Sequence, residues 1–312
     1  MKDSKDDKMR IIRTSLVAAC VLVGTSAANA SEYGFSTYGL GSNAFGAGVT
    51  PPPGTYVSTA FGFYSGTIGG TVNFGGTILN AGAKVQFLSA AENGLYVPDM
   101  DVFGGHLGLS VTVPVGQIEL RANVGPVAAS TDGGGLGDIT SKLQLGWTEG
   151  AFSQTFYVQA VAPTGRYAVG FSPNIGLNRP GIDTGWAFTY VDTRSKLQFN
   201  GTAGVTFNFE NTATDYQSGD EFHFEWATGY QLSPALVVGV AGYDYRQLTG
   251  DSGTGAKLGS FMGSVDAIGP ALSYTTLIGK TPLIVSLRDY QEFNAENRFQ
   301  GNTAIGTATV RF

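Results

Sequence analysis

A strict alternation of side-chain character over residues 196–210 is the feature that most restricts the fold of this chain. The odd positions are apolar or small, namely Leu197, Phe199, Gly201, Ala203, Val205, Phe207 and Phe209. Polar residues and one glycine fill the even positions. Successive side chains of a β-strand point to opposite faces, so the pattern predicts a two-faced strand. Soluble sheets commonly use strands of about five or six residues, whereas a membrane-spanning strand needs about 9–11.

The same alternation recurs along the chain and predicts about twelve strands. It is clear at residues 117–124, 142–148 and 303–312, where one face is apolar or small and the other carries Gln, Asn, Thr or charged residues. The expected strands are 55–65, 102–114, 116–126, 137–149, 152–163, 184–193, 196–210, 219–232, 234–247, 262–276, 281–293 and 299–312.

Long and short connections alternate between these strands. Tight turns are expected at Val115–Gly116, Glu149–Gly150, 193–195, Ser233–Pro234 and 278–280, with long segments such as 66–101 between them. Outer-membrane barrels have short periplasmic turns and longer outer loops. Because unpaired backbone groups are not tolerated in hydrocarbon, such a sheet has to close. The sequence therefore predicts an all-β fold, a closed antiparallel transmembrane β-barrel of about twelve strands. Composition alone also allows a secreted sandwich or solenoid.

Composition limits the chemistry and the partners of the chain. Charged residues make up only 13% of it, against roughly 25% in soluble domains. The single cysteine, Cys20, lies in the N-terminal apolar stretch, which excludes disulfides, thiolate catalysis and cysteine-bound metals for the rest of the chain. A net charge of −6 argues against nucleic acid as a partner. We expect neither a cofactor nor a metal.

The N-terminal residues have the character of a targeting segment. A basic start, the apolar stretch TSLVAACVLVGTSA and the small residues Ala28–Asn29–Ala30 predict a signal peptide over residues 1–30, cleaved near Ala30. Residues 31–54 do not alternate cleanly, and they form either a plug in the barrel or a periplasmic tail; we favour the plug. Residues 55–312 would form the barrel, which places the protein in the outer membrane of a Gram-negative bacterium.

The stretch GDEFHFEWATGY, residues 219–230, sets charged and aromatic residues at alternate positions. Glu221, His223 and Glu225 share one face, which we expect to line the lumen. The aromatic residues between them belong to the opposite face. Together with Tyr243 and Tyr245 of the next strand, they are expected to form a girdle at the lipid boundary.

Further charged residues are expected to join this face. A tight turn at Ser233–Pro234 is expected to place Glu221 opposite Asp244, with Arg246 close enough to compensate the two acids. The strand 281–293 adds lumen side chains by the same parity, and one arginine could fold inward from an outer loop. The full set of lumen or solute-path candidates is Glu221, His223, Glu225, Asp244, Arg246, Arg288, Tyr290, Glu292 and Arg166. Either a structural charge network or contact with solute would explain them.

Residue spacing gives little support for catalysis. His106 and His223 are the two histidines, and neither lies in a zinc-binding spacing such as H-E-x-x-H. No G-x-S-x-G nucleophile motif is present. We therefore expect no enzymatic activity. The alternatives are a barrel enzyme that hydrolyses lipids or esters, with His223 as base and Ser218 or Ser260 as nucleophile, and a structural or adhesive barrel.

A set of motifs extends over most of the chain beyond the signal peptide. It comprises GVTPPPGTYV (48–57), GLGDIT (135–140), APTGRY (162–167), NIGLN (174–178), TDYQSGDEFHFEWATGYQLS (214–233), GYDYRQLTG (242–250), GAKLGSFMGSVDAIGPALSY (255–274) and the terminal RF. The set resembles the outer-membrane barrel family linked to the meta-cleavage pathway of phenol degradation, the SphA/MetA-like transporters. This resemblance implies a barrel that carries aromatic or other hydrophobic molecules.

Two further expectations concern partners. The final Phe312 resembles the signal that the barrel-assembly machinery reads. No energy-coupling motif is visible, so we expect passive passage of a small-molecule solute, with selectivity set by pore width, lumen charge and inward loops. Outer-membrane lipid would surround the barrel.

Overall fold

The computed structural model describes residues 34–74, 77–170, 173–257 and 259–312, which form a 14-stranded antiparallel sheet. The expected signal peptide lies outside the described residues. Within them, no helix is long and apolar enough to cross a membrane. The strands are β1 (Gly54–Phe74), β2 (Thr77–Val97), β3 (Asp101–Val102), β4 (Gly105–Val124), β5 (Val127–Leu136), β6 (Ile139–Glu149), β7 (Phe152–Ala162), β8 (Gly181–Asp192), β9 (Leu197–Asn208), β10 (Glu221–Gln231), β11 (Leu236–Gln247), β12 (Ser264–Ile278), β13 (Thr281–Glu296) and β14 (Gln300–Arg311).

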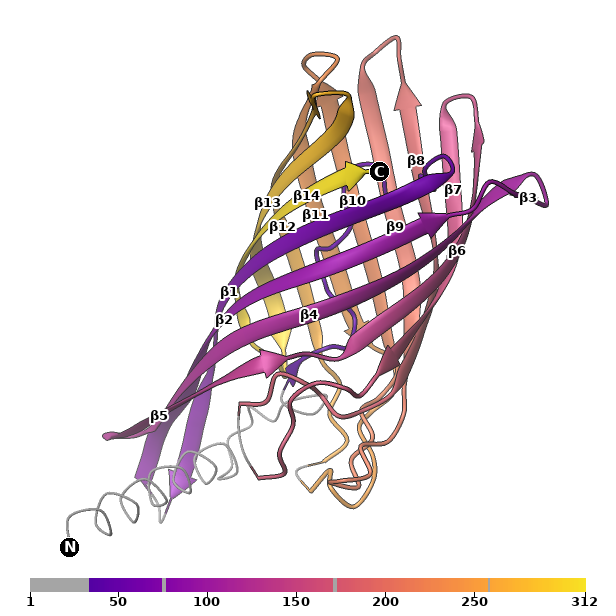
Figure 1. Ribbon diagram of the computed structural model, residues 1–312. Helices are drawn as coiled ribbons and strands as arrows, with labels where there is room; N and C mark the ends of the chain where they lie inside the picture. The colour runs from indigo at the N-terminus through magenta and orange to yellow at the C-terminus, as the bar shows by residue number, and fades with distance from the viewer. Residues whose placement is uncertain (1–33, 75–76, 171–172, 258) are drawn as a thin grey trace, which may run out of the picture.

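All of these strands except the short β3 and the off-path β5 close into a barrel of twelve strands (Figure 1). β1 pairs with β14 on one side and with β2 on the other, and β2 continues to β4 and around the ring. Closure pairs the backbone groups of the ring, as hydrocarbon requires. Large apolar side chains such as Phe61, Val111 and Phe156 are exposed on the outside of the wall. The predicted all-β transmembrane barrel is confirmed.

The two ends of the barrel differ in the length of their connections. Short turns join β6 to β7, β8 to β9, β10 to β11 and β12 to β13 at one end. The described parts of the long segments 163–180, 209–220 and 248–263 lie at the other end, at the bottom of Figure 1. Because outer-membrane barrels carry their longer loops outside the cell, we call the long-loop end the outer end.

One expected loop and one expected turn are wrong, and the two errors leave the predicted number of barrel strands unchanged. Residues 66–101 were expected to be a long loop, but most of them belong to β1 and β2, each of 21 residues. The turn expected at Val115–Gly116 lies in the middle of β4, which runs unbroken from Gly105 to Val124. One strand was therefore missed and another was divided in two.

A change of polarity along β4 explains the second error. Val111, Val113 and Val115 are exposed on the outer surface, whereas Ile118 and Leu120 are buried inside. The apolar residues thus move from odd to even positions within one strand. A tight turn would reset the alternation in the same way, so the sequence pattern alone could not separate the two cases.

The change of polarity along β4 also indicates where the wall leaves the membrane. In the outer part of the wall, Lys84 of β2 pairs with Arg121 of β4, and both point outward. Figure 1 shows β1, β2, β4 and β5 projecting past the other strands at the lower left. Charged side chains on the outside of a wall require water or lipid headgroups around them. We name these outer parts of β1, β2, β4 and β5 the extension.

The N-terminal residues 34–53 run inside the barrel, as the indigo trace in Figure 1 shows. Phe35, at the start of this internal segment, packs near the outer end against Phe299, which precedes β14. At its other end His106, in the first part of β4, lies against the Pro51 carbonyl (3.3 Å), and the chain then enters β1. The internal segment therefore follows the lumen from the outer end to the short-turn end.

Candidate functional site

The lumen face of β10 carries Glu221, His223 and Glu225, which are 0%, 0% and 1% exposed. The side chains alternate as expected, because Phe222, Phe224 and Trp226 are less buried and belong to the opposite face. A carboxylate this far from solvent needs hydrogen bonds or a cation to compensate its charge. For all three residues the internal segment supplies partners.

Glu225 is held by a turn of the internal segment. Its Oε1 accepts hydrogen bonds from the backbone N–H groups of Gly41 (2.5 Å) and Ser42 (3.2 Å), and its Oε2 accepts one from the N–H of Asn43 (2.8 Å). Three successive N–H groups that converge on one carboxylate form an anion-binding nest. Gly41 has a φ of 80°, and an added Cβ there would lie 2.8 Å from the Tyr290 ring. Glycine is therefore required at the centre of this turn.

The charge of Glu221 is compensated by other groups than that of Glu225. The Ser36 hydroxyl donates to its Oε2, and Arg179 Nη2 lies 3.6 Å from its Oε1. Arg179 comes from the long segment before β8 and is fully buried. It also donates to Ser218 Oγ (2.5 Å) and to the carbonyl oxygen of Phe35 (2.8 Å). One guanidinium thus joins an outer loop, the wall and the internal segment.

His223 lies between β8 and the internal segment. Its Nε2 is 2.8 Å from Asp183 Oδ2, which also accepts a hydrogen bond from the Thr206 hydroxyl (2.7 Å). The Tyr38 ring stacks on the imidazole with 3.5 Å between centroids and 13° between planes. Gly204 of β9 leaves the space for this ring, because an added Cβ would lie 2.6 Å from its Cε1 and Nε2.

Uncharged wall residues continue these contacts toward the short-turn end. Asn200 accepts a hydrogen bond from the Gly46 N–H (2.8 Å), and Thr189 accepts one from the Gly48 N–H (3.0 Å). Gln144 donates to the hydroxyl of Thr50 (3.0 Å), and this hydroxyl also lies 3.0 Å from that of Thr155. The internal segment is therefore bonded to the wall along its whole length.

The predicted residues of β13 divide into two groups. Arg288 donates to the Ser42 carbonyl (2.6 Å), and the Tyr290 hydroxyl donates to the Gly41 carbonyl (3.4 Å). Both therefore hold the same turn as Glu225. Glu292 instead accepts hydrogen bonds from the hydroxyls of Tyr64 (2.9 Å) and Tyr243 (2.8 Å), which are wall residues.

The expected pairing of Glu221 with Asp244 is wrong. β10 and β11 pair with Gln231 opposite Val237, so Glu221 pairs with Gln247 and Asp244 pairs with Phe224, three residues away from the expected register. This shift of three residues reverses the parity of β11. Asp244 and Arg246 consequently share the outward face of Phe222 and Phe224. Outside the lumen, Arg246 Nη2 lies 2.7 Å from Asp244 Oδ2 and 2.7 Å from Asp266 Oδ1.

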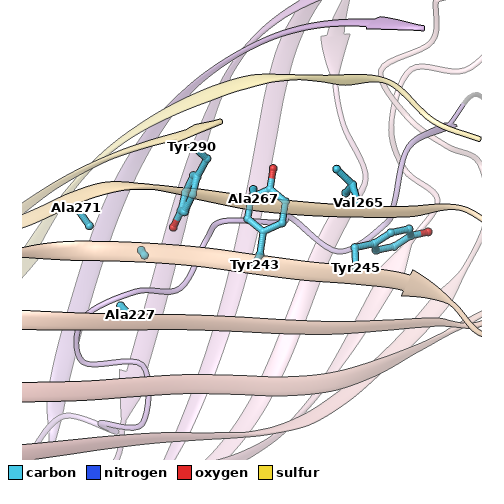
Figure 2. Packing of buried hydrophobic residues seen from close by; sticks show 8 residues of the cluster. Ala227, Tyr243, Tyr245, Val265, Ala267, Ala271 and Tyr290 are labelled. Atoms are coloured by element: carbon cyan, nitrogen blue, oxygen red, sulfur yellow. The ribbon is translucent and has the colours of Figure 1, made fainter. Parts of the chain in front are cut away.

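The same reversal corrects the expected aromatic girdle. Tyr243 and Tyr245 are 3% and 2% exposed, and they lie inside the barrel with Tyr290 (Figure 2). Tyr243 and Tyr290 approach to 5.2 Å between ring centroids. The girdle residues of β10 keep the outward position that was expected.

Arg166 does not reach the lumen network. It is exposed, its N–H donates to the Leu136 carbonyl (2.7 Å), and its Nη1 donates to the Gly134 carbonyl (2.5 Å). The long segment after β7 thereby lies along the end of β5. The cation that does enter from this segment is Arg179.

Sequence reasoning missed Arg179 and Asp183 for the same reason. Both lie just outside the strand that was expected to begin at residue 184, so no alternation assigned them a face. The only signal was indirect, because buried acids on β10 require a cation or donors nearby.

The outer end of the lumen also contains an apolar region that alternation did not reveal. Val85, Ile118, Leu120 and Phe299 form a buried cluster, and Phe35 packs against it from the internal segment. We name these four residues the outer chamber. An aqueous pore would expose polar side chains here, whereas this end of the lumen buries apolar ones.

A closed barrel with an apolar outer surface, and with a chain segment bonded inside a largely polar lumen, defines an outer-membrane β-barrel protein. The chain belongs to the family described as "Putative MetA-pathway of phenol degradation", whose model matches residues 66–306. The resemblance inferred from the sequence motifs is thereby confirmed.

A solved structure shows the same fold. The chain is similar to an outer membrane channel from Pseudomonas putida F1, with 16% sequence identity, a TM-score of 0.70, and coverage of 86% of this chain and 98% of that chain. A FadL homologue from Pseudomonas aeruginosa has 6% identity and a TM-score of 0.44, with 83% and 89% of the two chains covered. No curated protein sequence matches the chain.

Proposed function

We propose that this protein is an outer-membrane channel for the passive passage of small aromatic or other hydrophobic compounds. The observation that carries the proposal is the outer chamber. Val85, Ile118 and Leu120 are 0%, 4% and 7% exposed and belong to the inner face at the outer end of the barrel. In the wall of a water-filled pore, this position would carry polar residues.

The extension continues the apolar surface outward. Ala83 and Ala122 are paired neighbours on its inner face, and Ile68 packs beside them. Its outer face is charged, as Lys84 and Arg121 show. A hydrophobic molecule arriving from outside therefore meets apolar surface only on the side that leads into the barrel.

The internal segment fills the lumen below the chamber and controls what passes. Glu225, Arg288 and Asn200 hold it by hydrogen bonds, and such bonds contribute about 0.5–3 kcal/mol each. A segment held in this way can shift without breaking the barrel. Family membership and the outer-membrane channel fold support the same proposal.

The geometry at His223 does not favour the alternative of a hydrolase. The ring nitrogen that faces Asp183 is 2.8 Å from it, and Tyr38 covers the ring face. The imidazole thus packs between two fixed groups, and a substrate ester would have to displace Tyr38 to reach it.

Uptake by cells tests the proposed function. The lipopolysaccharide leaflet resists apolar molecules, so radiolabelled toluene at low concentration should enter faster in cells that produce the protein than in cells that lack it. A polar tracer, L-arabinose, should show a much smaller difference. A Leu120→Asp variant that still assembles should lose the toluene effect. Equal toluene uptake with and without the protein would refute the proposal.

A further inference from the structure

The apolar position that the Phe35 ring occupies against the outer chamber, here called the Phe35 seat, is a feature that the charge network of the lumen does not explain. The Phe35 ring packs against the outer chamber, with its centroid 6.1 Å from that of Phe299 and 24° between the ring planes. It is a benzene ring surrounded by aliphatic and aromatic side chains at the outer end of a membrane barrel. The ring belongs to the internal segment and not to the wall, so the wall provides a site that an aromatic group from another part of the chain occupies.

The atoms next to this ring are held by a separate set of contacts. The Phe35 carbonyl accepts a hydrogen bond from Arg179, and the Ser36 hydroxyl donates to Glu221. These polar contacts do not require the phenyl group. The backbone can therefore keep its position while the ring rotates out of the chamber, because rotation about χ1 moves the ring without moving the carbonyl.

We propose that the Phe35 seat is a binding site for a small monocyclic aromatic molecule, which enters the outer chamber in place of the Phe35 ring. Val85, Leu120 and Phe299 supply the apolar contacts, and the ring of Phe299 supplies a partner for offset stacking. The inference rests on the proposed function, and it specifies the first binding site for the solute within the barrel. Phe35 is then an internal competitor that holds the seat closed when no solute is present.

Competition of this kind has a defined effect on affinity. A site that is open in only a fraction of molecules shows an apparent affinity reduced by that fraction. Removal of the Phe35 ring frees the seat, so the affinity for an added aromatic molecule should rise. A purely structural role for Phe35 would give the opposite result, since loss of the ring would loosen the chamber and weaken binding.

The experiment uses the full mature chain purified in detergent, with 4-fluorophenol as the probe and fluorine NMR as the readout. Phe35→Ala should bind 4-fluorophenol about tenfold more tightly than the parent. Adding Leu120→Asp to Phe35→Ala should abolish saturable binding. The matched control is Phe45→Ala, which removes a ring of the same internal segment near Gly229 and should leave the affinity unchanged. Heat-modifiability on a gel verifies that each variant has closed its barrel.

Unchanged or weaker binding by the folded Phe35→Ala variant would overturn the inference, and so would an equal gain with Phe45→Ala. These outcomes can be told apart from failure of the proposed function. Toluene uptake that depends on the protein, together with no saturable binding at the seat, would retain the channel and reject the seat. Saturable binding that responds to Phe35→Ala without any effect on uptake would retain the seat and reject the channel.

Discussion

Arg179 Nη2 lies 3.6 Å from Glu221 Oε1, and the two side chains are 0% and 1% exposed. On the outer wall, Arg246 and Asp266 approach more closely, to 2.7 Å, but are 40% and 19% exposed. The shorter distance does not mark the more important pair. Removing one partner of a buried pair leaves an uncompensated charge away from water, whereas solvent compensates an exposed one.

Replacing Arg179 should therefore cost far more than replacing Arg246. We expect Arg179→Ala to lower the free energy of unfolding by about 3–5 kcal/mol, because the Glu221 carboxylate stays buried. Arg246→Ala should lower it by about 0–1 kcal/mol. Urea titration of the two variants in detergent micelles measures the difference. Similar losses in both variants would show that Glu221 finds water or another donor in the absence of Arg179.

The nest around Glu225 predicts a change in conductance. Glu225→Ala removes the acceptor of three N–H groups, so the turn at Gly41, still bonded to Arg288 and Tyr290, should loosen and the single-channel conductance in planar bilayers should increase. Glu292→Ala is the matched control, since that carboxylate bonds to Tyr64 and Tyr243 of the wall. A larger conductance in the control than in Glu225→Ala would contradict the assignment of Glu225 to the internal segment.

Packing at His223 predicts an effect of a single methyl group. Gly204→Ala places a Cβ 2.6 Å from the imidazole, which would have to shift away from Asp183 or press on Tyr38. Overpacking of this kind costs about 1–3 kcal/mol. Gly94→Ala serves as the control, because an added Cβ there meets nothing within 4 Å. Equal unfolding midpoints for the two variants would show that the ring moves freely.

The success and the failure of sequence reasoning both follow from strand periodicity. The lumen position of His223 could be predicted, because it depends only on alternation within β10. The position of Asp244 could not, because it depends on the register between β10 and β11, in which Gln231 pairs with Val237. An error of three residues reverses the face of every side chain in the second strand. Parity is thus reliable within a strand and unreliable across a turn.

The partners of the lumen residues could not be predicted from strand periodicity. Glu225 was recognised as a lumen residue, but its ligand is backbone N–H of Gly41 and its neighbours, which carry no side-chain signal. Arg179 bonds across 144 positions of sequence to Phe35. Contacts of this kind are set by the closed barrel and the path of the internal segment through it, and not by any local pattern.

The polarity change along β4 predicts where the wall meets the outer aqueous phase. Val113 and Arg121 lie on the same face of this strand, and Val113 belongs to the apolar part while Arg121 belongs to the extension.

Cys20 is the only cysteine and falls within the expected signal peptide, so single cysteines can be introduced into an otherwise thiol-free mature chain. Arg121→Cys should react with a membrane-impermeant maleimide on intact cells. Val113→Cys should remain unlabelled because lipid surrounds it, and Asp99→Cys in the β2–β4 connection should react only after lysis. Labelling of Asp99→Cys but not Arg121→Cys on intact cells would mean that the barrel has the reverse orientation.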